Sequence, residues 1–198
     1  VVDLHVPGGA ANLVNLVHDS RTSIDGVLNA YKDGRIGGSV YFLSPHGFAV
    51  GAQGQVNLGR LTVLTPTQEY MQGFFDPTGG VNADAMAAFE SGNVPLSETG
   101  LISIRGTVAA RDSVSLLANS VSVAGEILTG PEAARHIAFS ELVNTEDVEP
   151  GTEAVETEPG VIEIRAGSGG ASVEGRLAAE GASGIDGGSI EVRATGDI

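Results

Sequence analysis

A short pattern recurs along this chain and constrains its fold more than any other feature. The pattern is apolar-x-apolar-x-Gly-x-apolar. Clear copies begin at Ile102, Val121, Ala171 and Ile190, the last with one extra residue, and looser copies begin at Val40, Val56 and Leu61. The first two clear copies are 19 residues apart, and so are the last two. A repeat of this length must correspond to one small structural unit that stacks on its neighbours.

Apolar residues at every second position predict strands with one buried face. A period near 19 residues is too short for a βαβ unit or for a helical repeat such as ankyrin. It predicts one turn of a β-solenoid, with stacked short strands and with glycine at corners of positive φ. The alternative is an antiparallel β-sandwich. The Asn-Gly or Asp-Gly turns which that fold needs occur only irregularly, so we favour the solenoid.

The composition suits a packed β chain and narrows its partners. Hydrophobic residues make up 41% and charged residues 18%, which is too apolar for a disordered chain. Trp is absent and aromatics are 5%, so Val, Ile, Leu and Ala must fill the core. A net charge of −15 disfavours nucleic acid and anionic lipid as partners. Without Cys, the chain forms no disulfide and has no thiol chemistry.

The ends of the sequence indicate a piece of a longer protein. Residues 1–7 have no basic start and no long apolar run, so they do not predict a signal peptide. No stretch approaches the roughly 20 apolar residues of a membrane span, so we expect no membrane insertion. Because the chain begins without Met and ends within a copy of the pattern, we expect a processed or truncated segment.

Two segments that depart from the repeat are expected to flank or cover it. Residues 1–22 alternate irregularly and are expected to cap the first turn. Residues 66–98 contain three prolines and a helical stretch over 82–91, which begins with a good N-cap residue, Asn, and is followed by Gly. Met86 and Phe89 share one face of that helix and should cover the side of the solenoid.

A third segment, residues 131–159, is expected to be a solvated and partly mobile excursion. Between 141 and 158 it carries seven acidic residues and no Lys or Arg. We expect it and residues 66–98 to decorate one domain that spans residues 1–198, rather than to separate domains.

Residues 12–65 carry a resemblance to a known family. They read Asn-Leu-Val-Asn-Leu-Val-His-Asp-Ser-Arg at 12–21, Ile-Asp-Gly-Val-Leu-Asn-Ala at 24–30, Asp-Gly-Arg-Ile-Gly-Gly-Ser-Val-Tyr-Phe-Leu-Ser-Pro-His-Gly-Phe at 33–48 and Val-Gly-Ala-Gln-Gly-Gln-Val-Asn-Leu-Gly at 50–59. This strongly resembles the haemagglutination-activity, or secretion, domain of two-partner secretion exoproteins, the family of filamentous haemagglutinin. The leukotoxin-type filamentous adhesins, which include biofilm-matrix adhesins, are the most similar branch. Residues 100–145 and 187–198 continue the likeness.

The family's signature, Asn-Pro-Asn-Gly-Ile, has a counterpart in this chain at residues 44–48. Both Asn and the Ile are replaced there, and the companion Asn-Pro-Asn-Leu motif is not visible. The resemblance implies that the secretion motif read by the transporter consists of Asn12, Asn15, Ser44, Pro45, His46, Gly47 and Phe48.

The resemblance also implies a fold and a function. The expected fold is all-β, a right-handed parallel β-helix (a single-stranded solenoid) with an N-terminal cap. The expected function is that of the N-terminal secretion domain of a large filamentous adhesin. An outer-membrane transporter of the two-partner type would export it through the periplasm to the cell surface or medium. The domain would then nucleate folding, and the full-length adhesin would bind polysaccharide or surface glycan in adhesion or biofilm formation.

No pattern in the sequence predicts catalysis, a metal site or a cofactor. The residues of His18-Asp19-Ser20 alternate between the faces of an extended chain, so they cannot form a catalytic relay. Neither a His-Glu-x-x-His motif nor zinc-ligand spacing occurs. We therefore expect a protein that is not an enzyme.

Two alternative functions stay open. The segment itself could bind glycan or exopolysaccharide through Tyr31, Tyr41, Tyr70 or the 66–98 loop. Less favoured is a β-helix enzyme that degrades polysaccharide, which needs converging carboxylates. The acids and bases of the regular turns are instead expected to form solvated pairs between turns on the outward face. These residues are Glu163 and Arg165, Glu174 and Arg176, and Glu191 and Arg193.

Overall fold

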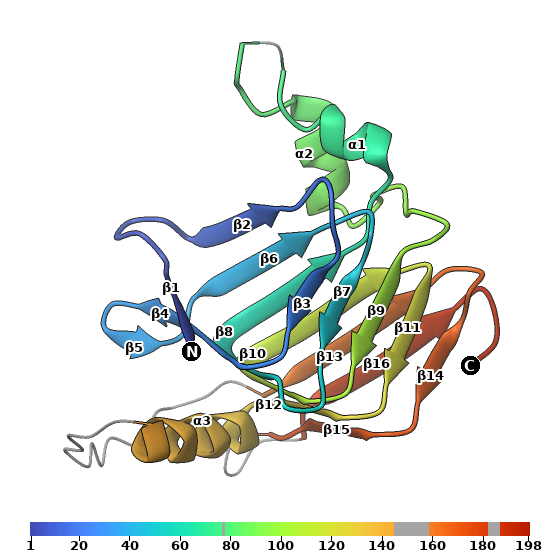
Figure 1. Cartoon of the computed structure of the whole chain (residues 1–198). Helices are drawn as coiled ribbons and strands as arrows, with labels where there is room; N and C mark the ends of the chain where they lie inside the picture. The colour runs from blue at the N-terminus through green and yellow to red at the C-terminus, as the bar shows by residue number, and fades with distance from the viewer. Residues whose placement is uncertain (77, 145–158, 182–186) are drawn as a thin grey trace.

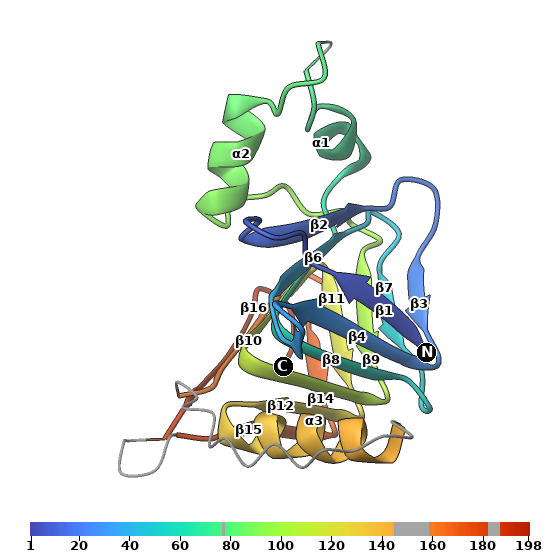
Figure 2. The ribbon, with the colours of Figure 1, turned by 90° about the vertical axis from the view of Figure 1, so that its left-hand side faces the viewer.

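The computed structural model describes residues 1–76, 78–144, 159–181 and 187–198 (Figures 1 and 2). Within these residues the chain forms sixteen strands and three helices. The strands are β1 (Val2–His5), β2 (Asn12–Leu16), β3 (Thr22–Ile24), β4 (Val27–Lys32), β5 (Arg35–Ile36), β6 (Ser39–Leu43), β7 (Phe48–Val50), β8 (Gln55–Leu64), β9 (Leu101–Ile104), β10 (Thr107–Ala118), β11 (Ser120–Val123), β12 (Glu126–Thr129), β13 (Val161–Ala166), β14 (Ala171–Val173), β15 (Arg176–Ala179) and β16 (Ser189–Ala194). The helices are α1 (Gln68–Gln72), α2 (Ala83–Glu90) and α3 (Pro131–Asn144).

The strands form two parallel sheets, one of eleven strands and one of five. The large sheet contains two ladders. Ladder one is β1-β4-β8-β10-β12-β15, and ladder two is β2-β6-β8-β10-β13-β16. The long strands β8 and β10 contribute to both. The small sheet is β3-β7-β9-β11-β14. Among the described strands, only the short β4–β5 pair is antiparallel.

The predicted pairing between copies is confirmed for the three clear copies that begin at Ile102, Val121 and Ala171, and is wrong for the one that begins at Ile190. Ile102 lies opposite Val121, and Val121 lies opposite Ala171, so the small sheet aligns the first residues of three copies. Ile162 lies opposite Ile190 in ladder two. Most apolar positions of these copies are buried in one hydrophobic core between ladder one, ladder two and the small sheet, although Val173 and Ile190 are exposed. The 19-residue spacing therefore identifies the pairing of Ile102 with Val121, but not that of Ile190, which lies in the other sheet from Ala171.

The predicted fold class, by contrast, is wrong. The sequence and its resemblance led us to expect an all-β right-handed parallel β-helix, a single-stranded solenoid. The described chain is a mixed α/β fold, in which three helices accompany two separate parallel sheets and the described strands form no closed sheet. Two-residue alternation reports that one face of a strand is buried, and the period reports its neighbours. Neither reports how sheets join or which helices cover them.

The glycines of the repeat also have a different role from the predicted one. Gly106, Gly125 and Gly175 are not among the positive-φ residues. They are required by space instead. A Cβ on Gly125 would lie 2.1 Å from the carbonyl oxygen of Gly106, and one on Gly175 would lie 2.0 Å from that of Gly125. These glycines, with Gly54 before them, form a column in which the backbones of successive copies touch.

The predicted helix over residues 82–91 is confirmed by α2. Asn82 is its N-cap, and its side-chain oxygen accepts hydrogen bonds from the backbone amides of Asp84 and Ala85. Phe89 packs against the outward face of the large sheet, with its ring centroid 5.2 Å from that of Tyr41. The 66–98 segment thus covers ladder two, as its apolar helix face indicates (Figure 2).

The expectation for residues 131–159 is wrong over their first half. Pro131–Asn144 form the helix α3, which lies against β10 and β12 (Figure 1). Ala133 and Ile137 are buried in a cluster with Ala109 and Leu128, so this part is not a solvated excursion. Buried apolar surface holds the helix in place. Residues 145–158 lie outside the described residues.

The predicted cap, residues 1–22, extends the sheets rather than forming a separate unit. β1 pairs with β4, and β2 pairs with β6, so both are the outermost strands of their ladders. At Thr22 the chain enters β3, the outermost strand of the small sheet.

Candidate functional site

The residues predicted to form the secretion motif gather at the N-terminal corner of the molecule. Asn12 and Asn15 lie on β2, where they pair with Ser39 and Phe42 of β6. Residues 44–48 follow β6 directly and lead into β7. The structure therefore brings the two parts of the motif onto neighbouring strands. Asn12, however, lies at the end of β2 that is remote from the turn.

The motif itself is a tight turn. The amide of Gly47 donates to the carbonyl oxygen of Ser44 over 3.2 Å, and the amide of His46 donates to Ser44 Oγ over 3.2 Å. Ser44 Oγ in turn donates to the carbonyl oxygen of Ser20 over 2.8 Å. Gly47 has φ 102°, and a Cβ there would lie 2.3 Å from the carbonyl oxygen of Leu101. This position therefore admits only glycine.

Within Ser44–Phe48, every residue except His46 is buried. Phe48 is 1% exposed, and its ring centroid lies 5.2 Å from that of Phe42 in the core. The side chain of His46 is the one part of the turn that the folded protein presents to solvent. The motif is therefore mainly a structural corner once the chain has folded.

The neighbouring N-terminal segment is held to this corner by backbone hydrogen bonds. The amide of Val17 donates to the carbonyl oxygen of Leu43, and the amide of Thr22 donates to that of Gly47. Asn15 is half-buried, and its Nδ2 donates to the carbonyl oxygen of Tyr41 over 3.1 Å, whereas Asn12 is exposed. These contacts fix strand register, and they place no acid beside a base or nucleophile.

Two of the three predicted charge pairs form, although within a strand and not between turns. Arg165 pairs with Glu163 over 2.6 Å, and Arg193 pairs with Glu191, in each case within one strand. The expected pairing of Glu174 with Arg176 is replaced by ion pairs to α3. Arg176 binds Glu132, which raises the pKa of Arg176, and Arg135 binds Glu180 over 2.7 Å. Exposed pairs of this kind contribute little to stability.

The residues that the structure describes show neither a cluster of metal ligands nor a membrane-spanning helix. Within residues 1–76, 78–144, 159–181 and 187–198, no group of three or more His, Cys, Asp or Glu is placed to hold a metal ion. In the same part of the chain, no helix has the length and apolar character needed to span a bilayer.

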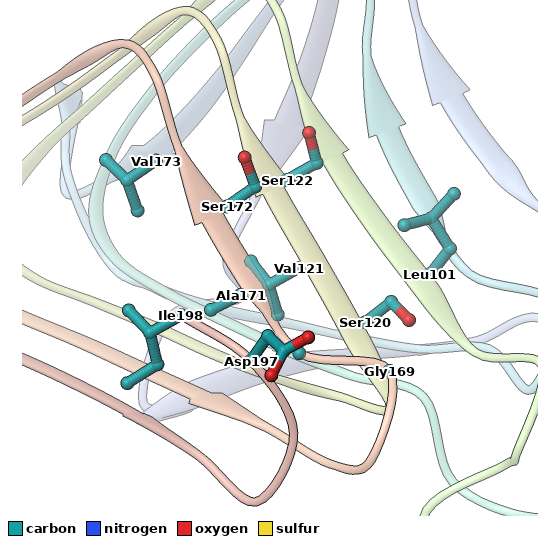
Figure 3. A pocket seen from close by; sticks show the side chains of 11 residues that line it. Leu101, Ser120, Val121, Ser122, Gly169, Ala171, Ser172, Val173, Asp197 and Ile198 are labelled. Atoms are coloured by element: carbon teal, nitrogen blue, oxygen red, sulfur yellow. The ribbon is translucent and has the colours of Figure 1, made fainter.

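A shallow depression of about 510 Å³ lies on the small sheet near its last strands (Figure 3). It is lined by hydroxyl side chains from β11 and β14, namely Ser120, Ser122 and Ser172, and by Asp197. Its lining includes no aromatic side chain. Hydroxyl groups could bond to a sugar, but the ring face on which sugars commonly stack is missing.

The tyrosines considered for glycan binding are engaged within the protein. Tyr41 packs against Phe89. The hydroxyl of Tyr70 donates to the carbonyl oxygen of Ala85 over 2.7 Å, and burial raises the pKa of Tyr70. The ring of Tyr31 stacks on His5 with centroids 5.4 Å apart. None of the three rings stands free as a platform.

The sequence reasoning missed a polar cluster beneath α3. Asn29 and Asn57 lie side by side on the outward face of ladder one, in the same column as Asp3. Both are buried, and the cluster extends through Gln55 to helix α3. The signal for it was the recurrence of Asn and Asp at equivalent outward positions of successive copies.

Comparisons with protein-family models, with curated proteins and with solved structures found no match for this chain. Its function is therefore inferred from its own residues and from the sequence resemblance.

Proposed function

We propose that this chain is the N-terminal secretion domain of a large bacterial filamentous adhesin. An outer-membrane transporter of the two-partner type recognises it in the periplasm and exports it to the cell surface or medium. The domain acts by binding and folding rather than by catalysis. Its stacked strands provide the template on which the rest of the adhesin folds, and the adhesin supports attachment or biofilm formation.

One observation carries this proposal. Four of the five residues of the Ser44–Phe48 turn are buried in the folded protein, including Phe48 in the core. A receptor can contact these side chains only while the chain is extended, before β6 has paired with β2 and β7 with β3. Recognition before folding is what export through a narrow pore requires. The same residues then serve the folded domain as a corner.

Folding outside the cell also supplies a driving force for export. Each described strand after the first copy pairs in parallel with one made earlier in the chain. Each pairing buries apolar side chains in the shared core, and that burial is favourable without any nucleotide. Progressive folding therefore disfavours return of the chain through the pore.

The test is an export assay. The chain is expressed behind a signal peptide, with and without a two-partner transporter, and soluble protein in the medium is quantified. We expect release that depends on the transporter. Folded protein that stays in the periplasm in both cases contradicts the proposal.

A matched pair of variants separates motif recognition from folding. His46→Ala changes the one exposed side chain of the motif and should lower release several-fold while leaving the thermal unfolding midpoint unchanged. Glu174→Ala alters an exposed residue at a later corner and should not change release. Equal release from both variants removes His46 from the recognition motif.

A second pair asks whether the transporter reads a strand. An extended segment such as β2 could add to an exposed sheet edge of the transporter. Val14→Pro removes a backbone donor from this segment, whereas Val14→Thr keeps it on a half-exposed side chain. If strand addition operates, the proline variant blocks export and the threonine variant does not.

A further inference from the structure

Strand β16 is the last strand of ladder two, and it has a neighbouring strand on one side only (Figure 1). It pairs in parallel with β13, and no other described strand lies along its second edge. Ile190, near the start of β16, is 47% exposed, although the equivalent Ile162 on β13 is buried. An unpaired edge with exposed apolar surface is a template on which another strand can add.

The hydrogen bonds that β16 makes on its paired side show which of its backbone groups face the free edge. The amide of Ser189 donates to the carbonyl oxygen of Gly160, and the amide of Thr195 donates to that of Ala166. Successive residues of a strand direct their backbone groups to alternate sides. The even-numbered residues of β16 therefore direct their amides and carbonyl oxygens towards the free edge.

Two charged side chains flank the centre of this edge. Glu191 and Arg193 lie on the outward face of β16, because Val192 between them packs against the core, and they form an ion pair with each other. Glu191 lies opposite Glu163 of β13, so like charges face each other there. Arg193 likewise lies opposite Arg165. Like charges directly opposite each other on neighbouring strands are unfavourable. A new strand with the reverse order of charges would supply both side chains with an opposite charge.

A second copy of β16 has this reverse order when it runs antiparallel to the first. If Val192 lies opposite its own counterpart, Glu191 of each copy faces Arg193 of the other. The even-numbered residues then exchange backbone hydrogen bonds. Glu191 and Arg193 fall at the non-hydrogen-bonded pairs, where facing Cα atoms are only about 4.5 Å apart. A shift of the register by two residues in either direction would place Glu191 opposite Glu191, or Arg193 opposite Arg193.

We propose that two copies of this chain associate edge to edge through β16, about a two-fold axis at Val192, so that the large sheet continues across the dimer. The interface is built on one strand from each copy, so it is small, and the dimer is weak and reversible. It lies at the opposite end of ladder two from β2, and it does not rest on the proposed secretion function.

The other free edges fit such a contact less well. β14 and β15 are shorter than β16, and Arg176 of β15 is already held by Glu132 of α3. Pairing of β16 with β2 of a second copy would extend ladder two head to tail. The columns of the ladder would then place Glu191 opposite Val14, and Arg193 opposite Leu16, so neither charge would gain a partner. A head-to-tail contact would also grow into fibres and not stop at a dimer.

Sedimentation velocity of the whole chain over a wide range of concentration tests the association. We expect a reversible equilibrium between monomer and dimer, without larger species. Arg193→Glu places like charges opposite each other twice in the dimer and should raise the dissociation constant about tenfold. Arg165→Glu is the matched control, because it makes the same change on β13, whose two edges are both paired. It should leave the dissociation constant nearly unchanged, and thermal unfolding checks that both variants fold.

Mixtures of variants test the antiparallel register. Glu191→Arg carries two basic side chains at this edge, and Arg193→Glu carries two acidic ones. Each variant alone should associate weakly, whereas an equimolar mixture should dimerise about as strongly as the unaltered chain. Because the chain has no Cys, thiols can report the facing pair. A mixture of Glu191→Cys with Arg193→Cys should form disulfide-linked dimers, and neither variant alone should do so readily.

Several results would overturn the proposal. One is a chain that stays monomeric at every concentration, and another is growth into fibres, which indicates a head-to-tail contact. A third is association that Arg193→Glu weakens no more than Arg165→Glu does. The last is a charge-reversed mixture that associates no better than its two components.

Discussion

Two helical segments cover the outward face of the large sheet, and they are held there by different forces. The α1–α2 segment covers ladder two through apolar and aromatic side chains, with Met71 only 1% exposed. Helix α3 covers ladder one with one apolar half, centred on Ile137, and one polar half, in which His136 and Ser140 contact Gln55. The α1–α2 segment is therefore held by a small hydrophobic core of its own. Helix α3 is held partly by directional hydrogen bonds.

The difference shows how stability and position can be assigned to separate interactions. Burial of apolar surface is strong and has little directionality, so it holds α1–α2 without demanding one orientation. Buried amide hydrogen bonds add little net energy, but they penalise any displacement that leaves a donor or acceptor unpaired. Helix α3 is therefore expected to be less stable than α1–α2 and more exactly placed.

The largest loss of stability is expected from a cavity in the apolar contact between α1–α2 and ladder two. Met71→Ala removes a fully buried side chain of α1 and should cost about 2–5 kcal/mol in the free energy of unfolding. The half-buried Met86 on α2 provides the matched control, and Met86→Ala should cost clearly less. Urea titration followed by circular dichroism measures both. If both variants lose the same free energy of unfolding, the α1–α2 segment does not pack as a core around Met71.

The next largest loss of stability is expected in the hydrogen-bonded contact between ladder one and α3. Asn57→Ala removes the hydrogen bonds that the buried Asn57 makes to Asn29 and Gln55, and should cost about 1–3 kcal/mol. The exposed Asn93 is the control, and Asn93→Ala should be nearly neutral. A double variant with Asn29→Ala should cost less than the sum of the single ones, because both belong to one network. Additive costs would mean that the amides act independently.

A smaller effect concerns the N-termini of α2 and α3, which are capped differently. Asn82 caps α2 with its side chain, so Asn82→Ala should cost about 1 kcal/mol, whereas Asn82→Asp keeps the acceptor and should cost little. Helix α3 begins instead with Pro131 after Gly130, whose φ is 71°. Thermal unfolding compares the two Asn82 variants. An equal loss in both would show that the cap oxygen is not what stabilises α2.

The smallest effect concerns pH and Tyr70. Tyr70→Phe removes the hydrogen bond to Ala85 and should cost about 0.5–1.5 kcal/mol near neutral pH. Burial raises the pKa of Tyr70, so its contribution is complete below the pKa of unfolded tyrosine, near 10. The contribution is lost as pH rises through the higher pKa of the folded state. Denaturation at pH 7 and alkaline titration at 295 nm check the two statements, and Tyr41→Phe, which keeps its ring contact, should cost less.

The sequence was informative where a pattern is local or strictly periodic. The neighbours of Ile102 and Val121 followed from a fixed spacing, and α2 followed from the cap at Asn82 and the position of Phe89. Helix α3 was not predicted because only a few residues of its buried face, such as Ile137, are apolar. The rest of that face is polar and meets Gln55 and Asn57, contacts between segments about 80 residues apart. No local pattern records such pairs.

The candidate site was predictable in composition but not in burial. The resemblance selected Ser44–Phe48, and the turn residues Pro45 and Gly47 indicated a corner. Nothing in the sequence indicated that Gly47 would press against Leu101, because β9 is separated from it by the whole 66–98 segment. The fold class was missed for a related reason, since alternation describes single strands and not the helices that cover them.

The glycine column has a consequence for how such a chain can change its length. The links from β9 to β10, from β11 to β12 and from β14 to β15 contain two residues each, and the second is always a glycine of the column. The longer excursions, 66–98 and 131–160, leave from the other two corners. Foreign loops could therefore be grafted at those corners without moving a strand. A single residue inserted beside Gly125 would instead displace this glycine from its contact with Gly106.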